Sequence, residues 1–318
     1  MLKTVIILLC AVALDGLIPK HTYWRPTDWL ANYTAALIQL LHPRLSANAP
    51  TRHFLRGAFA LFLQITPIFP LLVVLYTWTD QAGVLDLLLL FVALDYVAPK
   101  RRLRRLYALL QQGQFDQARH IAHTWLTRDP DNLTPPELAR AALETYALIF
   151  FRRIFTLLCW FIVLGGVGAW LYWLIMMFDR QCARLGMATV YFRTLAMRLC
   201  AAAEWLPARL FALTVLVTSH PRRVWRCWRN QAWHWRTPAD QLVLAIVGGR
   251  LGLMLGGPTV EYGYTLARPY LGIGNPVTTR DLRRIEGLMN QCLWRWLLGL
   301  AFLAWIIYEP FNLDAYAL

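Results

Sequence analysis

The sequence predicts an all-α fold, a polytopic membrane helical bundle of about five or six membrane helices in which residues 1–318 form a single domain. Two properties of the composition support this prediction. Hydrophobic residues make up 58% of the chain and charged residues only 16%, and the mean hydropathy is +0.41. Ordinary soluble domains are less apolar and more highly charged. The third observation is a series of apolar runs, several of them near the length that crosses a bilayer.

Six such runs follow one another along the chain. The first has the length of either a signal-peptide core or a short first membrane helix, and the sequence leaves both alternatives open. Pro67 and Pro70 lie inside the second run, where proline removes a backbone donor, so we expect a kink there. The runs are residues 5–18, 54–78, 84–98, 154–178, 206–218 and 293–308.

A basic cluster follows the third run directly. Every residue from Lys100 to Arg105 except Leu103 is positively charged, which places this end of the run in the cytoplasm by the positive-inside rule. Residues 103–146 then show helical periodicity with soluble character. Residues 100–153 are therefore predicted to be a cytoplasmic helical insertion, and a protein partner could dock on it.

The chain is also strongly basic, with a net charge of +14. Residues 219–292 are predicted to be a cytoplasmic or interfacial loop region, and they begin with tryptophans interleaved with arginines. That pattern occurs where nucleic-acid bases stack and where a helix lies in the headgroup layer of a membrane. Because the chain is so apolar, we expect the lipid bilayer and its anionic headgroups as partners, and no nucleic acid.

Short motifs that would define a metal or nucleotide site are missing. The six cysteines are scattered without a C-x-x-C pair, and no histidine stands at ligand spacing. The chain has no phosphate-binding loop, no nucleophile elbow and no zinc-protease motif. The sequence therefore predicts no metal site. It also contains no catalytic motif from which a reaction could be assigned by residue types alone.

One stretch, residues 248–272, is rich in glycine and interrupted by proline. Glycine permits backbone turns and close approaches that other residues resist, while Pro258 and Pro269 fix φ and remove donors. A continuous membrane helix is excluded here, and the stretch alone is consistent with a structural loop between helices.

The order of motifs resembles the CobD/CbiB family of integral membrane proteins. Gly256-Gly257-Pro258, Gly263, Arg268-Pro269 and Gly272 resemble the G-G-P…G…[KR]-P-x-x-G signature of that family. A second segment, Trp205 to Leu210, resembles its W-x-P-A-R-L sequence, and the similarity extends over roughly residues 10–300. The resemblance implies a bacterial inner-membrane, multi-pass protein.

Family members attach aminopropanol, or its phosphate, to adenosylcobyric acid late in cobalamin biosynthesis. The resemblance implies ATP and Mg²⁺ as cofactors if that activity is retained, and otherwise no cofactor. It also marks the candidate site residues, which are Glu144 and Asp179 as catalytic and Arg128, Asp129, Arg209, Gly256, Gly257, Pro258, Gly263 and Arg268 as substrate-binding.

Several acidic and amide positions of the family pattern are apolar in this chain. Apolar side chains can neither bind a hard cation nor transfer a proton. On this ground the sequence favours a non-catalytic regulatory protein similar to the AmpE-like branch, linked to β-lactamase regulation or envelope sensing, with the cobalamin enzyme as the alternative. The replaced positions are occupied by Leu148, Ile149, Met176, Cys200 and Ala201.

Overall fold

The structure, a computed structural model, describes most of the chain. The described ranges are 2–17, 26–42, 50–79, 81–126, 128–131, 133–184, 190–217, 220–231, 238–261, 264–266 and 268–313.

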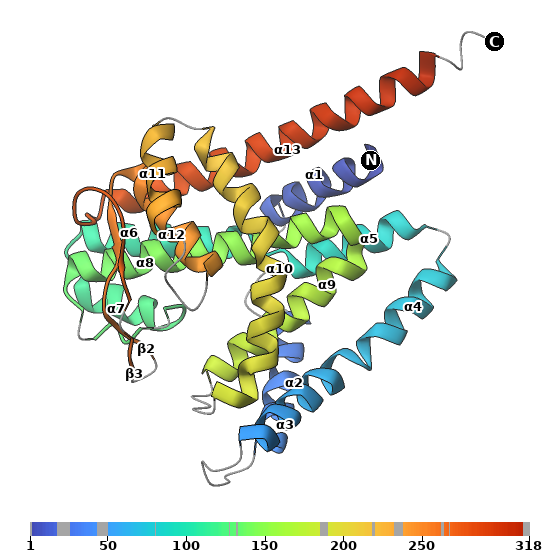
Figure 1. The fold of residues 1–318 in the computed structure, drawn as a ribbon, viewed down its shortest axis with the longest axis horizontal. Helices are drawn as coiled ribbons and strands as arrows, with labels where there is room; N and C mark the ends of the chain where they lie inside the picture. Colours follow the sequence, from blue (N-terminus) through green and yellow to red (C-terminus); the bar gives the residue numbers. More distant parts are fainter. Residues whose placement is uncertain are drawn as a thin grey trace.

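The described chain is almost entirely helical (Figure 1). Its helices are α1 (Leu2–Leu17), α2 (Pro26–Leu41), α3 (Pro50–Ile65), α4 (Ile68–Trp78), α5 (Ala82–Ala93), α6 (Val97–Gln111), α7 (Phe115–His123), α8 (Pro135–Phe150), the π-helix η1 (Phe151–Thr156), α9 (Leu157–Arg184), α10 (Val190–Leu216), α11 (Pro221–Gln231), α12 (Pro238–Leu251) and α13 (Asp281–Leu313).

Four helical stretches are long and apolar enough to cross a membrane, which confirms the predicted polytopic all-α class. They are Thr51–Trp78, Ala82–Gln111, Pro135–Arg184 and Tyr191–Leu216. Residues 5–17 of the first predicted run lie in α1 and the predicted run 293–308 lies in α13, and neither helix meets the same criterion within the described residues. Residues 206–216 of the fifth predicted run are only the C-terminal part of α10, because the helix extends in the N-terminal direction past Arg193 and Arg198.

The first stretch of this set, Thr51–Trp78, is interrupted where proline predicts it. The helix ends at Ile65 and restarts at Ile68, with Pro67 at the N-cap of α4. On α4 the apolar side chains of Leu71, Val73 and Trp78 are exposed, as expected for a helix that faces lipid.

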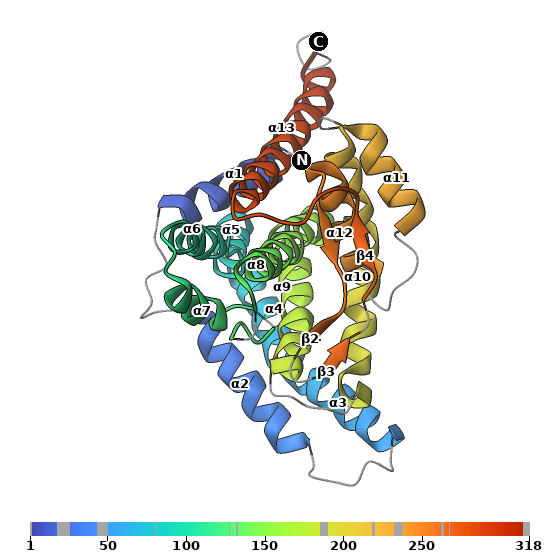
Figure 2. The ribbon, with the colours of Figure 1, turned by 90° about the vertical axis from the view of Figure 1, so that its left-hand side faces the viewer.

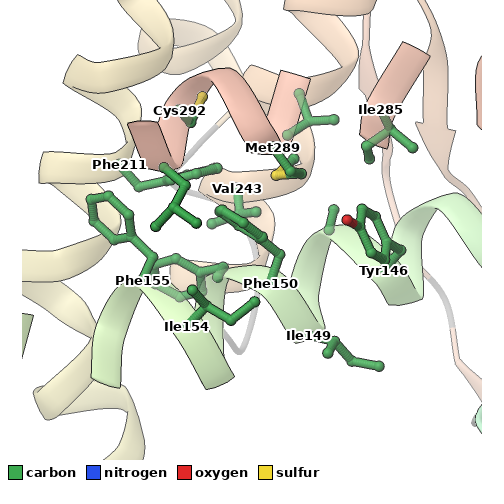
Figure 3. Close-up of a cluster of buried hydrophobic side chains, with 14 of the residues drawn as sticks. Tyr146, Ile149, Phe150, Ile154, Phe155, Phe211, Val243, Ile285, Met289 and Cys292 are labelled. Carbon is green, nitrogen blue, oxygen red and sulfur yellow. The ribbon is translucent and has the colours of Figure 1, made fainter. Parts of the chain in front are cut away.

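The central element is a helical rod that runs from α8 through η1 into the first half of α9, and it joins the predicted insertion directly to a membrane span (Figures 1 and 2). Its side chains form the core with α10, α12 and α13 (Figure 3). Phe155 packs edge-to-face on Phe211 of α10, with ring centroids 5.2 Å apart. Val243 of α12 and Met289 of α13 lie in the same cluster. Such close packing fixes the rod against three other helices.

The rod bends at Gly165, whose φ of 65° and ψ of −159° are not helical. The N–H group of Gly166 is freed by this bend and donates a hydrogen bond of 2.9 Å to Oδ1 of Asp86 on α5. The Tyr76 hydroxyl donates to the same oxygen. Asp86 therefore caps the second half of α9 from a neighbouring helix, since a freed helical donor inside a membrane needs an acceptor.

A second glycine allows two membrane helices to touch. A Cβ on Gly57 of α3 would lie 1.9 Å from the carbonyl oxygen of Phe192 on α10. Small residues at such crossings let helix backbones approach closely in membranes.

The Gly57→Ala substitution should therefore lower the free energy of unfolding by about 1–3 kcal/mol, because the added methyl overpacks the contact. Unfolding of the detergent-solubilised protein by sodium dodecyl sulfate, followed by circular dichroism, measures the change. The matched control is Gly287→Ala on α13, where a Cβ meets no atom within 4 Å. Equal stability of the two variants would contradict the proposed crossing.

The glycine-rich stretch is not a plain loop. It forms strands β1 (Met254–Gly256), β2 (Thr259–Glu261), β3 (Tyr264–Leu266) and β4 (Tyr270–Gly272). β1 pairs antiparallel with β4, and β2 pairs antiparallel with β3. The β1–β4 pair lies against α12 (Figure 2), at the end of the molecule that also holds α6, α7 and the start of α8 (Figure 1).

Candidate functional site

Glu144 lies at the centre of a buried polar cluster, with only 2% of its surface exposed. Its Oε1 accepts a hydrogen bond of 2.7 Å from the backbone N–H of Gly256. Its Oε2 accepts a hydrogen bond from Nη2 of Arg128 and lies 3.8 Å from Nη2 of Arg268. Both arginines are also buried. Four of the candidate residues, from four separate segments, are thus brought together.

The start of α8 directs Glu144 into this cluster. Thr134 is the N-cap, and its backbone N–H donates 2.9 Å to Oε2 of Glu137, which closes a capping box. Pro135 occupies the first helical position, where a missing N–H costs nothing. The helix start is therefore fixed in sequence, and Glu144 follows on the face that packs inward.

Two glycines shape the opposite wall. Gly256 and Gly257 have φ values of 74° and 85°, which side chains with a Cβ rarely adopt. A Cβ on Gly256 would lie 2.4 Å from the carbonyl oxygen of Pro269. The N–H of Gly257 donates 3.0 Å to that same oxygen. This contact holds Pro269, and with it Arg268, alongside β1.

Guanidinium groups outnumber carboxylates among the described contacts of this cluster. One carboxylate faces two guanidinium groups, and Arg140 stands one turn before Glu144 on α8. The buried Nε of Arg140 has no hydrogen-bond partner in the described part of the chain. Guanidinium groups present N–H donors in a planar fork that matches carboxylate and phosphate oxygens. The charge and shape therefore suit an anionic ligand.

Asp179 lies in a different buried network. Its Oδ2 accepts 2.7 Å from Nη2 of Arg193. The same region holds Arg152, whose Nη2 donates 3.0 Å to Asp240 and whose Nε lies 3.1 Å from Oε1 of Glu204. These groups join α9, α10, α12 and η1, but no contact connects Asp179 to Glu144 among the described residues.

Sequence reasoning missed this network. The sequence motifs identify neither Arg152 nor Glu204 as a site residue. In the structure the Tyr172 hydroxyl also donates 3.1 Å to Glu204, and Arg153 donates 2.8 Å to Asp95 at the break between α5 and α6. The available signal was ionisable residues at the ends of apolar runs, because charged residues next to membrane helices usually face the interior and find a partner there.

Arg209 and Pro258 are not among the residues that contact Glu144 in the described part of the chain. Arg209 stacks on the Trp205 ring of its own helix, 3.6 Å from the centroid, and donates 2.8 Å to the Trp205 carbonyl. Pro258 is exposed between β1 and β2. Gly263 lies outside the described residues.

Asp129 belongs to an exposed group with His123 and Asp131, whose ligand-type atoms all lie within 4.8 Å of one another. Nε2 of His123 is 2.8 Å from Oδ1 of Asp131, a pairing of histidine and carboxylate that the sequence does not predict. Imidazole and carboxylate ligands suit a divalent cation. Exposed acidic groups commonly gather without one, so the geometry alone does not define a metal site.

The fold and the cluster together define the class of protein. It is an integral membrane helical protein with a buried carboxylate–guanidinium site that lies against a glycine-rich β-hairpin. The CobD/Cbib protein family model matches residues 8–289. The chain therefore belongs to the CobD/CbiB family, as its motifs predicted.

Three relatives carry the name "Cobalamin biosynthesis protein CobD". The Chromobacterium violaceum protein is 32% identical over 292 residues, covering 90% of this chain and 92% of the relative. The Stutzerimonas stutzeri protein is 30% identical over 250 residues, covering 79% and 82%. The Streptococcus sanguinis protein is 27% identical over 307 residues, covering 90% and 93%. No solved structure matches. These names fit the cobalamin enzyme better than the AmpE-like regulatory branch.

Proposed function

We propose that this protein attaches aminopropanol, or its phosphate, to adenosylcobyric acid by forming an amide bond. The observation that carries the proposal is the assembly of Glu144, Arg128, Arg268 and the Gly256 backbone into one buried cluster. These are motif residues of a family whose relatives are named for cobalamin biosynthesis.

Each group in the cluster has a task that suits this chemistry. The two guanidinium groups would bind the oxygens of an anionic substrate, either the carboxylate that becomes the amide or a phosphate. Glu144 already accepts hydrogen bonds from Gly256 and Arg128 and forms an ion pair with Arg268 at 3.8 Å, so its role would be to hold the arginines in a fixed geometry. The positive-φ glycines let Pro269 and Tyr270 approach β1 closely, which holds Arg268 beside Glu144.

Amide formation from a carboxylate needs activation, which ATP and Mg²⁺ would supply when bound. Glu144 is a poor Mg²⁺ ligand, because its oxygens already accept from an N–H group and lie against two cations. Asp129 and Asp131 are the better fit, since exposed carboxylates are the ligands that Mg²⁺ prefers. Asp129 directly follows Arg128 in sequence, so a cation held there would lie on the same loop.

The apolar replacements that favoured a regulatory protein have a structural role of their own. Met176 and Cys200 are 3% and 5% exposed, and Ile149 is 9% exposed. All three belong to the hydrophobic core. Their apolar character therefore serves packing, and it does not require that the Glu144 cluster has lost its chemistry.

Complementation tests the proposal. In a bacterial strain that lacks its CobD/CbiB enzyme, expression of this chain should restore cobinamide production from adenosylcobyric acid. Product is measured by chromatography of cell extracts, with the empty vector as control. If the protein reaches the membrane at normal levels and no product forms, the regulatory alternative replaces this proposal.

A further inference from the structure

Helix α11 has two chemically different faces. Val224 and Cys227 are buried, whereas Trp225 is 52% exposed. The exposed side also carries the four arginines of the helix, Arg222, Arg223, Arg226 and Arg229. No acidic residue occurs between Glu204 and Asp240, and no ion pair to these four arginines occurs within the described chain.

The chain places this helix close to the end of a membrane span. The fourth spanning stretch ends at Leu216, and α11 begins at Pro221. The five Cα–Cα steps from Leu216 to Pro221 span at most about 18 Å when fully extended. His220, with a φ of 70°, is a turn residue immediately before α11. The start of α11 must therefore lie within that distance of the point where α10 leaves the bilayer.

Contacts on the inner face fix which side of α11 points outward. A Cβ on Gly249 of α12 would lie 2.7 Å from Sγ of Cys227, so the two helices touch at that glycine. The Gln231 side chain accepts 2.7 Å from the N–H of Gly272 and donates 3.0 Å to its carbonyl oxygen. Because α12 and β4 hold this face, α11 cannot rotate about its axis to bury its arginines.

We propose that α11 lies in the headgroup layer and binds the headgroups of anionic phospholipids through its four arginines. Uncompensated guanidinium groups attract phosphate-bearing lipid, and an amphipathic tryptophan suits the headgroup level. Trp225 and Trp228 are in edge-to-face contact, with ring centroids 5.8 Å apart. Because Gln231 holds Gly272, the lipid surface also braces the β1–β4 hairpin that bears Gly256.

Site-directed spin labelling measures the depth of the helix in the full-length protein. Of the six cysteines only Cys10 is exposed, and burial raises the pKa of the Cys227 thiol and so keeps it unreactive. In a Cys10→Ser background, Trp225→Cys is labelled with a nitroxide, and exposed Gln117→Cys on α7 serves as the water-facing control.

In phosphatidylcholine vesicles with about 30% phosphatidylglycerol, the label at 225 should be several-fold less accessible to a water-soluble nickel chelate than the label at 117. In pure phosphatidylcholine this protection should weaken. Equal accessibility at 225 and 117 would overturn the proposed location, and protection that does not depend on lipid charge would overturn the headgroup contact.

Charge removal tests the arginines directly. In neutral detergent, the Kd of the protein for short-chain phosphatidylglycerol should rise about 25-fold in the double variant Arg226→Gln with Arg229→Gln, because each basic residue contributes roughly fivefold. Arg280→Gln with Arg283→Gln removes the same charge near the start of α13 and should leave the Kd unchanged. Equal losses in the two double variants would overturn a specific role of α11.

Discussion

Replacing Glu144 with glutamine should lower kcat/KM for amide formation by about a hundredfold or more. This is the size of effect expected when catalytic geometry shifts by about 1 Å. The substitution preserves the shape of the side chain and its acceptor for the Gly256 N–H. It removes the negative charge that faces Arg128 and Arg268. The two guanidinium groups then repel each other within a buried site.

The kinetic pattern distinguishes two roles for Glu144. If it positions the arginines, the apparent KM for the anionic substrate should rise more than kcat falls. If it acts as a general base, kcat should fall more than the apparent KM rises. Product formation by protein reconstituted in vesicles with adenosylcobyric acid, aminopropanol phosphate, ATP and Mg²⁺ gives both parameters.

Asp116→Asn is the matched control. It removes one carboxylate from the fully exposed surface of α7, where Asp116 pairs with Arg119 at 3.6 Å. Such exposed pairs contribute little, so its activity should equal that of the unmodified protein. Full activity of Glu144→Gln would show that the Glu144 carboxylate has no role in the reaction.

The sequence predicted most of the membrane architecture, because the signals involved are local. Apolar runs mark helices, proline at position 67 marks the break before α4, and Thr134 with Glu137 marks the start of α8. What it could not predict is how α8 continues. The rod passes through η1 without a break, so the predicted insertion shares its last helix with a span.

The candidate site likewise has a part that the sequence predicted and a part that it could not predict. Motifs identified Arg128, Glu144, Gly256 and Arg268 one at a time, but their contact depends on pairing between β1 and β4. Three-residue strands rich in glycine carry no alternating apolar pattern, and so give no strand signal. The motifs also grouped Asp179 with Glu144, because a motif gives the identity and order of residues but not the distances between them. Its actual partner is Arg193.

The second large effect concerns stability. Arg152→Met should lower the free energy of unfolding by about 3–5 kcal/mol, because it leaves two buried carboxylates without their shared cation. Those carboxylates belong to Glu204 and Asp240, which are 2% and 7% exposed. Arg152 joins them at 3.1 Å and 3.0 Å. Sodium dodecyl sulfate unfolding of the detergent-solubilised protein measures the loss.

Two further variants separate buried charge from lost packing. Adding Glu204→Gln and Asp240→Asn to Arg152→Met should recover most of the stability, because neutral amides are far less costly to bury than unpaired carboxylates. Arg101→Met, at an exposed position on α6, should change stability by no more than about 0.5 kcal/mol. If the triple variant is as unstable as Arg152→Met alone, the arginine acts through packing of its aliphatic stem. The π-helix at Phe151–Thr156 would then position a space-filling side chain, and the ion pairs would be incidental to the bundle.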